Sequence, residues 1–523
     1  MYANLVLFNG NFITLDERRP RASALAVVDG KILGIGDYDD VKNLIGKDTV
    51  RLDLRGRTVV PGFTDAHVHL ISLGLAMQVM DLTAVTSKSA LLERVGDRVE
   101  DTHPGHWIRG HGFEESKLGE LPTRSELDPI SPENPVYLED VDSKICALNS
   151  LALRKVYGEE GDVEGVKIER DVNTGEMTGV IRAEDQDSLH RVVRMPTIDP
   201  VDEDLEVSEL EKAIEIACPK VMETGVTSAH DLQLPPNGLR AYKRALREDK
   251  MPLRLYLGFD RGRDIELKEY LDIGLGVESH PNTLKTGMVK LFADGRMSNG
   301  EFKRRVREAH EAGYQLAIHS LNDVEVERSL EAIEEALRAK PRKDHRHRIE
   351  HVFISNGSLI EKIKSLELIV STQPEFLYEF DGDFPVKLEA AHQRSMIEKG
   401  IRVAGGSDSP LIYRGGGAPS PRIFPTPLIG IGLEVSGKAK KNTLLREAGR
   451  VSFLEALKIH TVNGAYASFE EEIKGTLEVG KLADLVVLSE DPSEIDPEEI
   501  KNIRVEKTLI GGKITYTEED DFV

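Results

Sequence analysis

Short apolar runs alternate with longer amphipathic stretches through the middle of the chain, from about residue 61 to about residue 465. The apolar runs have the length of strands, whereas the stretches between them have the length and polarity of surface helices. Alternation of this kind is typical of a parallel α/β barrel or of a doubly wound sheet. Strands are predicted at 289–293, 315–319, 348–354, 367–372 and 401–405, and helices at 301–312, 324–340, 359–365 and 387–399.

The two ends of the chain differ from the middle, because short β-rich runs there are separated by turn residues. Asn9-Gly10 and Asp29-Gly30 lie between such runs near the beginning, and Gly511-Gly512 lies between two runs near the end. These dipeptides are strong signals for hairpins. Strands are therefore predicted at 5–8, 24–28, 32–35, 50–54, 483–488, 505–510 and 513–516.

Both ends share the same β-rich style around a different middle, which favours one discontinuous domain. We predict a small β-sandwich of residues 1–60 plus 470–523, with residues 61–469 inserted as a second domain. Two unrelated hairpins are the alternative for the ends.

Composition narrows the partners that the chain is expected to have. The net charge of -23 opposes binding to nucleic acid or to an anionic membrane, because affinity for phosphate needs clustered Lys and Arg. The two cysteines, Cys146 and Cys218, lie far apart in sequence, so a disulfide framework is not expected. No apolar run reaches the roughly 18 to 20 residues that span a bilayer, and residues 1–12 lack a signal-peptide pattern. We expect a cytoplasmic protein that has neither nucleic acid nor a membrane as its partner.

Two histidines one residue apart, His67 and His69, follow an apolar run that Pro61-Gly62 closes. In a strand, side chains two residues apart point to the same side, so the two imidazoles can bind one metal ion. The spacing alone is a weak signal, because His345-Arg346-His347 has the same spacing inside a basic run.

Four further polar residues stand where apolar runs end: Lys290, His319, His351 and Asp408. Some have ordinary alternatives: Lys290 as a surface lysine, His351 as part of the basic patch 342–348, and Asp408 as a turn cap. In a barrel, residues at the carboxyl ends of strands converge over one mouth. Together with the histidine pair, these four residues are therefore candidates for one metal site.

The order of these residues resembles the pattern of the metal-dependent amidohydrolase superfamily. That pattern has His-x-His on the first barrel strand, a lysine on the fourth, histidines on the fifth and sixth, and an aspartate on the eighth. The matching residues here are His67, His69, Lys290, His319, His351 and Asp408.

Flanking sequence is similar to the branch that contains exoenzyme-regulatory and N-substituted formamide deformylase-like amidohydrolases. The resemblance covers essentially the whole chain. The stretches that carry it are 61–69, 107–110, 122–124, 127–128, 225–227, 289–295, 349–351, 406–408, 463–465 and 480–488.

The resemblance implies a TIM-like (β/α)8 barrel beside the small β-sandwich, with a binuclear metal centre. It implies that Lys290 reacts with CO2 to form a carbamate that bridges two divalent ions. The ions are expected to be Zn²⁺, although Fe, Mn, Co and Ni also suit such ligands. His67, His69 and Asp408 are then expected to hold one ion, and His319 and His351 the other.

The reaction implied is hydrolysis of an amide-type, non-peptide carbon–nitrogen bond of a small molecule. Two Lewis acids lower the pKa of a shared water and polarise a carbonyl, so hydroxide is available near neutral pH. Asp408 is the expected catalytic residue, because it can accept the proton of the water and pass it to the leaving nitrogen. A deaminase or esterase using the same site is the runner-up, and a non-catalytic barrel scaffold is the alternative from another class.

Several positions depart from the relatives or have no assigned role. The segment 296–300 replaces the usual continuation after 293–295, and Lys144 stands in a stretch where relatives often carry Asp-Gly-His. A glycine-rich segment, 413–418 with Gly415 to Gly417 at its centre, is interpreted either as a flexible lid or as a plain surface loop. His111 and His230 end short strand-like runs, and contact with substrate or a place in the core are both open for them. The sequence also leaves open whether the chain forms a homo-oligomer.

Overall fold

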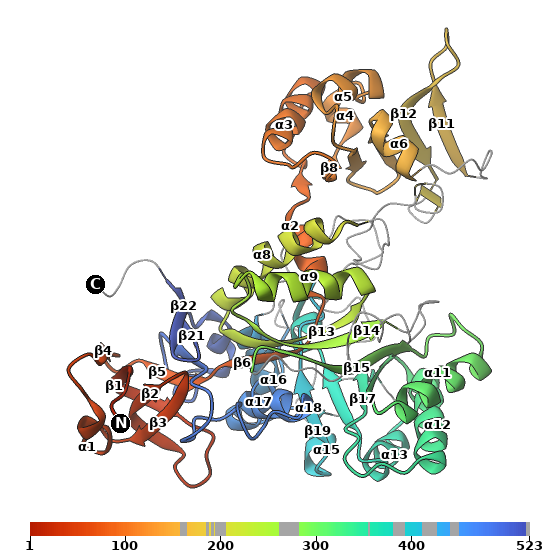
Figure 1. Cartoon of the computed structure of the whole chain (residues 1–523). Helices are drawn as coiled ribbons and strands as arrows, with labels where there is room; N and C mark the ends of the chain where they lie inside the picture. Colours follow the sequence, from red (N-terminus) through yellow and green to blue (C-terminus); the bar gives the residue numbers. More distant parts are fainter. Residues whose placement is uncertain are drawn as a thin grey trace. The chain divides into compact units, whose positions relative to one another are not determined.

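The computed structural model describes most of the chain (Figure 1). The described residues are 1–156, 165–184, 188–189, 193, 205–260, 282–353, 356–379, 393–410, 426–439 and 449–518. The chain divides into two compact units. The first contains Met1–Leu70, Ala217–Ser409 and Ile423–Val523, and the second contains Ile71–Ile216 and Pro410–Arg422. The domain boundaries predicted at 60/61 and 469/470 stay a prediction.

Eight parallel strands in the first unit form a nearly closed barrel, in the order β19-β18-β17-β16-β15-β14-β13-β6. The two strands at the ends of this order meet just beyond their carboxyl ends, where Asp408 N–H donates to the carbonyl of His67 and His69 N–H donates to that of Ser409. The TIM-like barrel is therefore confirmed, and the doubly wound alternative is wrong. Its strands are β6 (Phe63–Val68), β13 (Val226–Leu234), β14 (Arg254–Asp260), β15 (Leu284–Phe292), β16 (Gln315–Ser320), β17 (Arg348–His351), β18 (Ile369–Thr372) and β19 (Arg402–Gly405).

The helices that follow β15 and β16 begin at polar caps that the sequence supplies. Ser298 accepts a hydrogen bond from Glu301 N–H at the start of α11, and Asn322 accepts from two backbone N–H groups at the start of α12. Of the predicted helix 387–399, residues 387–392 lie outside the described residues. The helices of this unit are α1 (Tyr38–Val41), α9 (Pro236–Arg247), α11 (Asn299–Glu311), α12 (Asp323–Ala339), α13 (Ser358–Ser365), α14 (Pro374–Glu379), α15 (Gln393–Glu398), α16 (Pro427–Ser436), α17 (Phe453–Ile459) and α18 (Val462–Ala467), with 3-10 turns at Lys42–Leu44 and Pro497–Asn502.

Strands from both ends of the chain join one sheet, in the order β22-β21-β20-β5-β1-β2-β3, with β4 paired to β1. The junction is the antiparallel pairing of β5 with β20, in which Val60 lies opposite Val486. Apolar side chains from both ends share one core, including Phe12, Val59 and Leu485. The predicted sandwich stays a prediction. The strands are β1 (Leu5–Ile13), β2 (Arg21–Val28), β3 (Lys31–Gly36), β4 (Val50–Asp53), β5 (Thr58–Pro61), β20 (Leu485–Leu488), β21 (Val505–Ile510) and β22 (Lys513–Thr517).

One predicted turn is wrong. Asn9-Gly10 lies inside the continuous strand β1, where the pairing with β2 shifts register between Phe8 and Phe12. Asn9 has a φ of 57°, and a residue in this left-handed conformation produces a bulge as readily as a hairpin. Asp29-Gly30 and Gly511-Gly512 do form the predicted hairpins.

The second unit contains a six-stranded sheet that the sequence pattern did not reveal, in the order β11-β12-β10-β9-β8-β7. One face of this sheet packs against α3 and α5 through a core that includes Leu82, Leu91, Leu127 and Leu138. Its strands are β7 (Met80–Asp81), β8 (Ile108–Phe113), β9 (Val136–Asp140), β10 (Ile145–Leu148), β11 (Val166–Arg170) and β12 (Met177–Ala183). The remaining helices are α2 (Leu70–Met77), α3 (Lys88–Glu100), α4 (Glu115–Leu118), α5 (Arg124–Ile130), α6 (Ser150–Val156) and α8 (Val207–Glu223).

Over the part of the chain that the structure describes, helices with the length and apolar character needed to cross a membrane are absent.

Candidate metal centre

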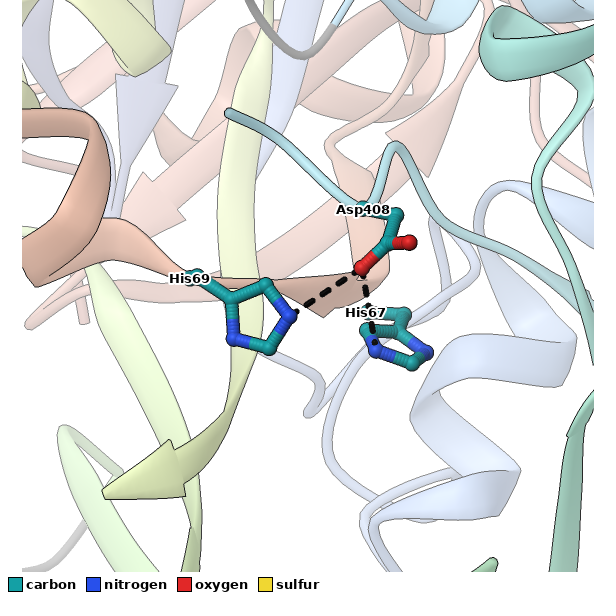
Figure 2. Close-up of side chains that lie close together, drawn as sticks. All are labelled: His67, His69 and Asp408. Carbon is teal, nitrogen blue, oxygen red and sulfur yellow. Dashed lines mark hydrogen bonds and ion pairs between the residues drawn. The ribbon is translucent and has the colours of Figure 1, made fainter. Parts of the chain in front are cut away.

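Three predicted ligands meet where the first and eighth barrel strands end (Figure 2). Asp408 Oδ1 lies 3.3 Å from Nε2 of His67 and 3.1 Å from Nε2 of His69. His67 is in β6, His69 follows that strand, and Asp408 stands three residues beyond β19. One ligand atom from each residue lies within 4.8 Å of the others, which is a spacing that a single metal ion can bridge.

The orientation of both histidines is fixed by acceptors on their other ring nitrogen. His67 Nδ1 donates to Glu350 Oε2 at 2.7 Å, and His69 Nδ1 donates to the carbonyl of Leu232 at 3.0 Å. A carboxylate and a carbonyl only accept, so each Nδ1 carries the proton and each Nε2 is turned toward Asp408. Metal-binding histidines are held in this way.

Lys290 is buried beside this group. Its Nζ lies 3.1 Å from Nε2 of His67, although 223 residues separate the two in sequence. Burial is the main reason that the pKa of Lys290 falls from 10.5 to about 8, and Glu350 and Asp408 oppose that shift. A substantial fraction of the amine is therefore neutral at mildly alkaline pH, which is the form that reacts with CO2.

His319 and His351 lie next to the same cluster. The ring centroid of His351 is 5.0 Å from that of His67 and 4.5 Å from that of His319. His351 Nδ1 donates to Gln373 Oε1 at 2.7 Å, which leaves its Nε2 as the nitrogen with a lone pair. Burial lowers the pKa of both histidines, so both are neutral imidazoles that can bind a cation.

The backbone carries strain at two of the predicted ligands. His351 has a φ of 78° and Asp408 a φ of 55°, in the left-handed region that side chains with a Cβ rarely adopt. Such conformations cluster at functional sites, where the surrounding structure holds them. The left-handed conformation thus occurs at two residues that are predicted to bind metal, one in β17 and one after β19.

The structure thus brings all six predicted residues into one cluster in the barrel unit. Four imidazoles, one carboxylate and a buried amine are a donor set that fits divalent cations. The assignment of each residue to a particular ion stays a prediction.

The residues that hold the predicted ligands in place were not predicted from the sequence. Asp65 Oδ1 accepts from the N–H groups of His67 and Ser407, and its Oδ2 accepts from the Ser407 hydroxyl at 2.6 Å. Asp65 thus ties β6 to the end of β19. Its position two residues before His67, on the same face of the strand, is the signal that was available. Glu350 and Gln373 are partners across long sequence distances, for which the chain gives no local signal.

The second His-x-His pair is not part of the cluster. His347 Nδ1 accepts from the N–H of Leu316, and His345 Nδ1 accepts from the N–H of His347. These contacts lie where β16 and β17 begin, whereas the metal cluster lies where they end. Position along the strand, rather than spacing, therefore separates the two pairs.

The residues to which the sequence assigned no role lie in different parts of the structure. His230 is buried in β13, where its Nδ1 accepts from Arg348 Nη1 at 2.9 Å. His111 is buried in β8 of the second unit, 3.5 Å from the Ser143 hydroxyl. The backbone N–H of Lys144 donates to Asp140. The glycine-rich segment 413–418 lies outside the described residues.

A parallel barrel with two histidines and an aspartate at the carboxyl ends of its first and eighth strands defines a class, the metal-dependent barrel hydrolases. The amidohydrolase family model matches residues 51–516, and the chain belongs to this family. It is an enzyme that acts on carbon–nitrogen bonds and uses a divalent metal.

Similar proteins share nearly the full length of the chain. It is 30% identical to the putative amidohydrolase YtcJ of Bacillus subtilis, covering 98% of this chain and 99% of that protein. It is 28% identical to the N-substituted formamide deformylase of Arthrobacter pascens, covering 98% of each. In fold, it is similar to an uncharacterized metal-dependent hydrolase from Pyrococcus furiosus, with a TM-score of 0.73 and 24% identity over 94% of this chain and 100% of that one.

Proposed function

We propose that this enzyme hydrolyses an amide-type, non-peptide carbon–nitrogen bond of a small molecule at a two-metal site. The observation that carries the proposal is the carboxylate of Asp408 placed between Nε2 of His67 and Nε2 of His69 in a barrel of the amidohydrolase family. The name of the Arthrobacter pascens relative, an N-substituted formamide deformylase, supports an amide-type bond.

In this proposal, His67, His69 and Asp408 hold one ion, and His319 and His351 hold the other. Zn²⁺ is the first candidate, and Fe, Mn, Co and Ni suit the same ligands. Bound divalent ions supply Lewis acidity, which lowers the pKa of water and polarises a carbonyl.

The residues of the chain have separate tasks. The amine of Lys290 would react with CO2 to give a carbamate and a proton, and the carbamate oxygens would then be available to hold the two ions. Asp408 Oδ2 is the carboxylate oxygen farther from the imidazoles of His67 and His69, and it accepts a proton from water and delivers it to the leaving nitrogen. Glu350 and Gln373 keep the imidazoles of His67 and His351 oriented throughout.

Metal analysis of protein prepared with zinc and bicarbonate tests the site. We expect about two equivalents of zinc per chain and about one for Lys290→Ala. A Lys290→Ala variant that keeps both ions and full activity would refute the bridge.

A substrate panel tests the reaction. It contains formamides, N-acyl amino acids, cyclic amides, amines for deamination and simple esters, each assayed with the metal-loaded protein. Turnover of amides is expected, whereas turnover of amines or esters alone would favour the deaminase or esterase.

A further inference from the structure

A fully buried ion pair lies directly behind the metal cluster, between alternate residues of β17. Arg348 Nε donates to Glu350 Oε1 at 2.8 Å, and Arg348 Nη2 donates to Glu350 Oε2 at 2.9 Å. Both side chains have 0% of their surface exposed. Burying such a pair is costly, and apolar residues of similar size are often at least as stabilising. The pair therefore calls for a role besides stability.

The ion pair is the middle of a longer chain of hydrogen bonds. Glu350 Oε2 accepts from His67 Nδ1 at 2.7 Å on one side, and Arg348 Nη1 donates to His230 Nδ1 at 2.9 Å on the other. We call the sequence His67–Glu350–Arg348–His230 the buried chain. It links the first barrel strand, β6, to β17 and β13.

Arg348 constrains His67 from two directions. It holds both oxygens of Glu350, so this carboxylate has one orientation and can only accept from His67. It also donates from Nη2 to the carbonyl of Ala66 at 2.7 Å, which fixes the backbone immediately before His67. The side chain and the backbone of His67 thus depend on one guanidinium.

His230 ends the buried chain and accepts a hydrogen bond from Arg348. A guanidinium only donates, so Nδ1 of His230 must carry the lone pair and Nε2 the hydrogen. That Nε2 is buried and has no hydrogen-bond partner among the described residues. The hydrogen bond that His230 makes in the described structure is therefore the one that orients Arg348.

We propose that Arg348 is a positioning residue of the metal centre, which aims Nε2 of His67 at the metal through Glu350 and Ala66, and that His230 orients Arg348. This inference rests on the proposed function only in that His67 binds metal. It assigns a role to two buried residues that are not among the six predicted ligands.

Metal affinity, measured separately from activity, tests the inference. Zinc dissociation constants are measured by chelator competition for the wild type, His230→Leu, His230→Asn and Arg348→Lys. Loss of an outer partner of a metal-binding histidine typically weakens affinity about 10- to 100-fold, and we expect this for His230→Leu and Arg348→Lys. His230→Asn retains an acceptor near the position of Nδ1, and we expect it to bind zinc within about threefold of the wild type.

A second buried pair supplies the matched control. Arg254 donates to both carboxylate oxygens of Asp484, at 2.6 Å and 2.8 Å, where β14 begins rather than where it ends. Arg254→Lys is expected to lower the thermal unfolding midpoint of the metal-free protein and to leave zinc affinity unchanged. The visible spectrum of the cobalt-loaded protein is expected to change for Arg348→Lys and not for Arg254→Lys.

The possible results separate the inference from its premise. If His67→Ala binds zinc as tightly as the wild type, His67 is not a ligand and the proposed function fails. If His67→Ala loses zinc but His230→Leu keeps wild-type affinity and an unchanged cobalt spectrum, the inference is overturned and the buried chain is structural. If Arg348→Lys does not fold, His230→Leu against His230→Asn decides alone.

Discussion

A Cβ atom added to Gly406 would lie 2.8 Å from Cβ of His67 and 2.9 Å from its Cα. The backbone after β19 thus passes so close to β6, the strand that carries His67, that only glycine fits at position 406. We expect Gly406→Ala to separate the two strands and to lose metal and activity together. Gly300→Ala is the control, because a Cβ at Gly300 in α11 meets nothing within 4 Å. Wild-type zinc content in Gly406→Ala would contradict the close approach.

Asp408→Asn keeps one oxygen that can face a metal and removes the carboxylate that accepts a proton. We expect kcat to fall by about 10²- to 10⁴-fold, the usual size of such a contribution. Steady-state kinetics with metal content measured in parallel would show it. Asp344→Asn, at an aspartate whose side chain is 63% exposed, is expected to behave as the wild type. A kcat within a few fold of wild type would exclude Asp408 as the proton acceptor.

The two His-x-His pairs are expected to respond oppositely to substitution. His67→Ala removes the ligand nitrogen that faces Asp408 and Lys290, so zinc binding should fall sharply. His345→Ala removes an acceptor for the N–H of His347 where β17 begins, so it should cost stability and leave zinc binding intact. Zinc titration and thermal unfolding of both variants provide the comparison. Equal zinc loss in both would mean that position along the strand does not define the site.

Lys290 gives the metal-free protein a predictable response to pH. Its pKa is 10.5 in an unfolded chain and about 8 in the buried site, because burial disfavours the ammonium. Between these values the unfolded chain binds more protons, so the free energy of unfolding rises with pH. Below pH 8 the buried ammonium costs about 3 kcal/mol.

Lys290→Met removes this titration and nothing else that ionises. We therefore expect the stability advantage of Lys290→Met over the wild type to shrink by up to about 3 kcal/mol between pH 7 and pH 10.5. Urea unfolding of bicarbonate-free, metal-free protein at several pH values measures it. A difference between the two proteins that does not change with pH would show that Lys290 titrates normally.

The site could be predicted from the sequence because each predicted ligand stands at the end of an apolar run, and parallel strands end on one side of a barrel. His67, Lys290 and Asp408 are far apart in sequence, yet this rule brings them together. This rule does not identify the residues that hold the ligands in place, such as Glu350. Glu350 differs from other buried glutamates only by the partners that it meets, and His67 is 283 residues away.

The fold could be predicted where the pattern of apolar, polar and turn residues is regular, and could not be predicted elsewhere. Asp29-Gly30 forms its hairpin, whereas Asn9-Gly10 becomes a bulge, because the partner strand continues past it. The six-stranded sheet of the second unit was missed, since strands as short as Met80–Asp81 have no readable period.

The sheet that unites both ends of the chain also limits how the enzyme can be cut. Strand β5 pairs with β20, and only Gly62 separates β5 from β6, the strand that carries His67. A fragment that stops before Leu485 would leave the backbone of β5 as an open edge, which favours aggregation. Engineering of this amidohydrolase should therefore treat the last strands as part of the catalytic scaffold, and not as a tail that can be trimmed.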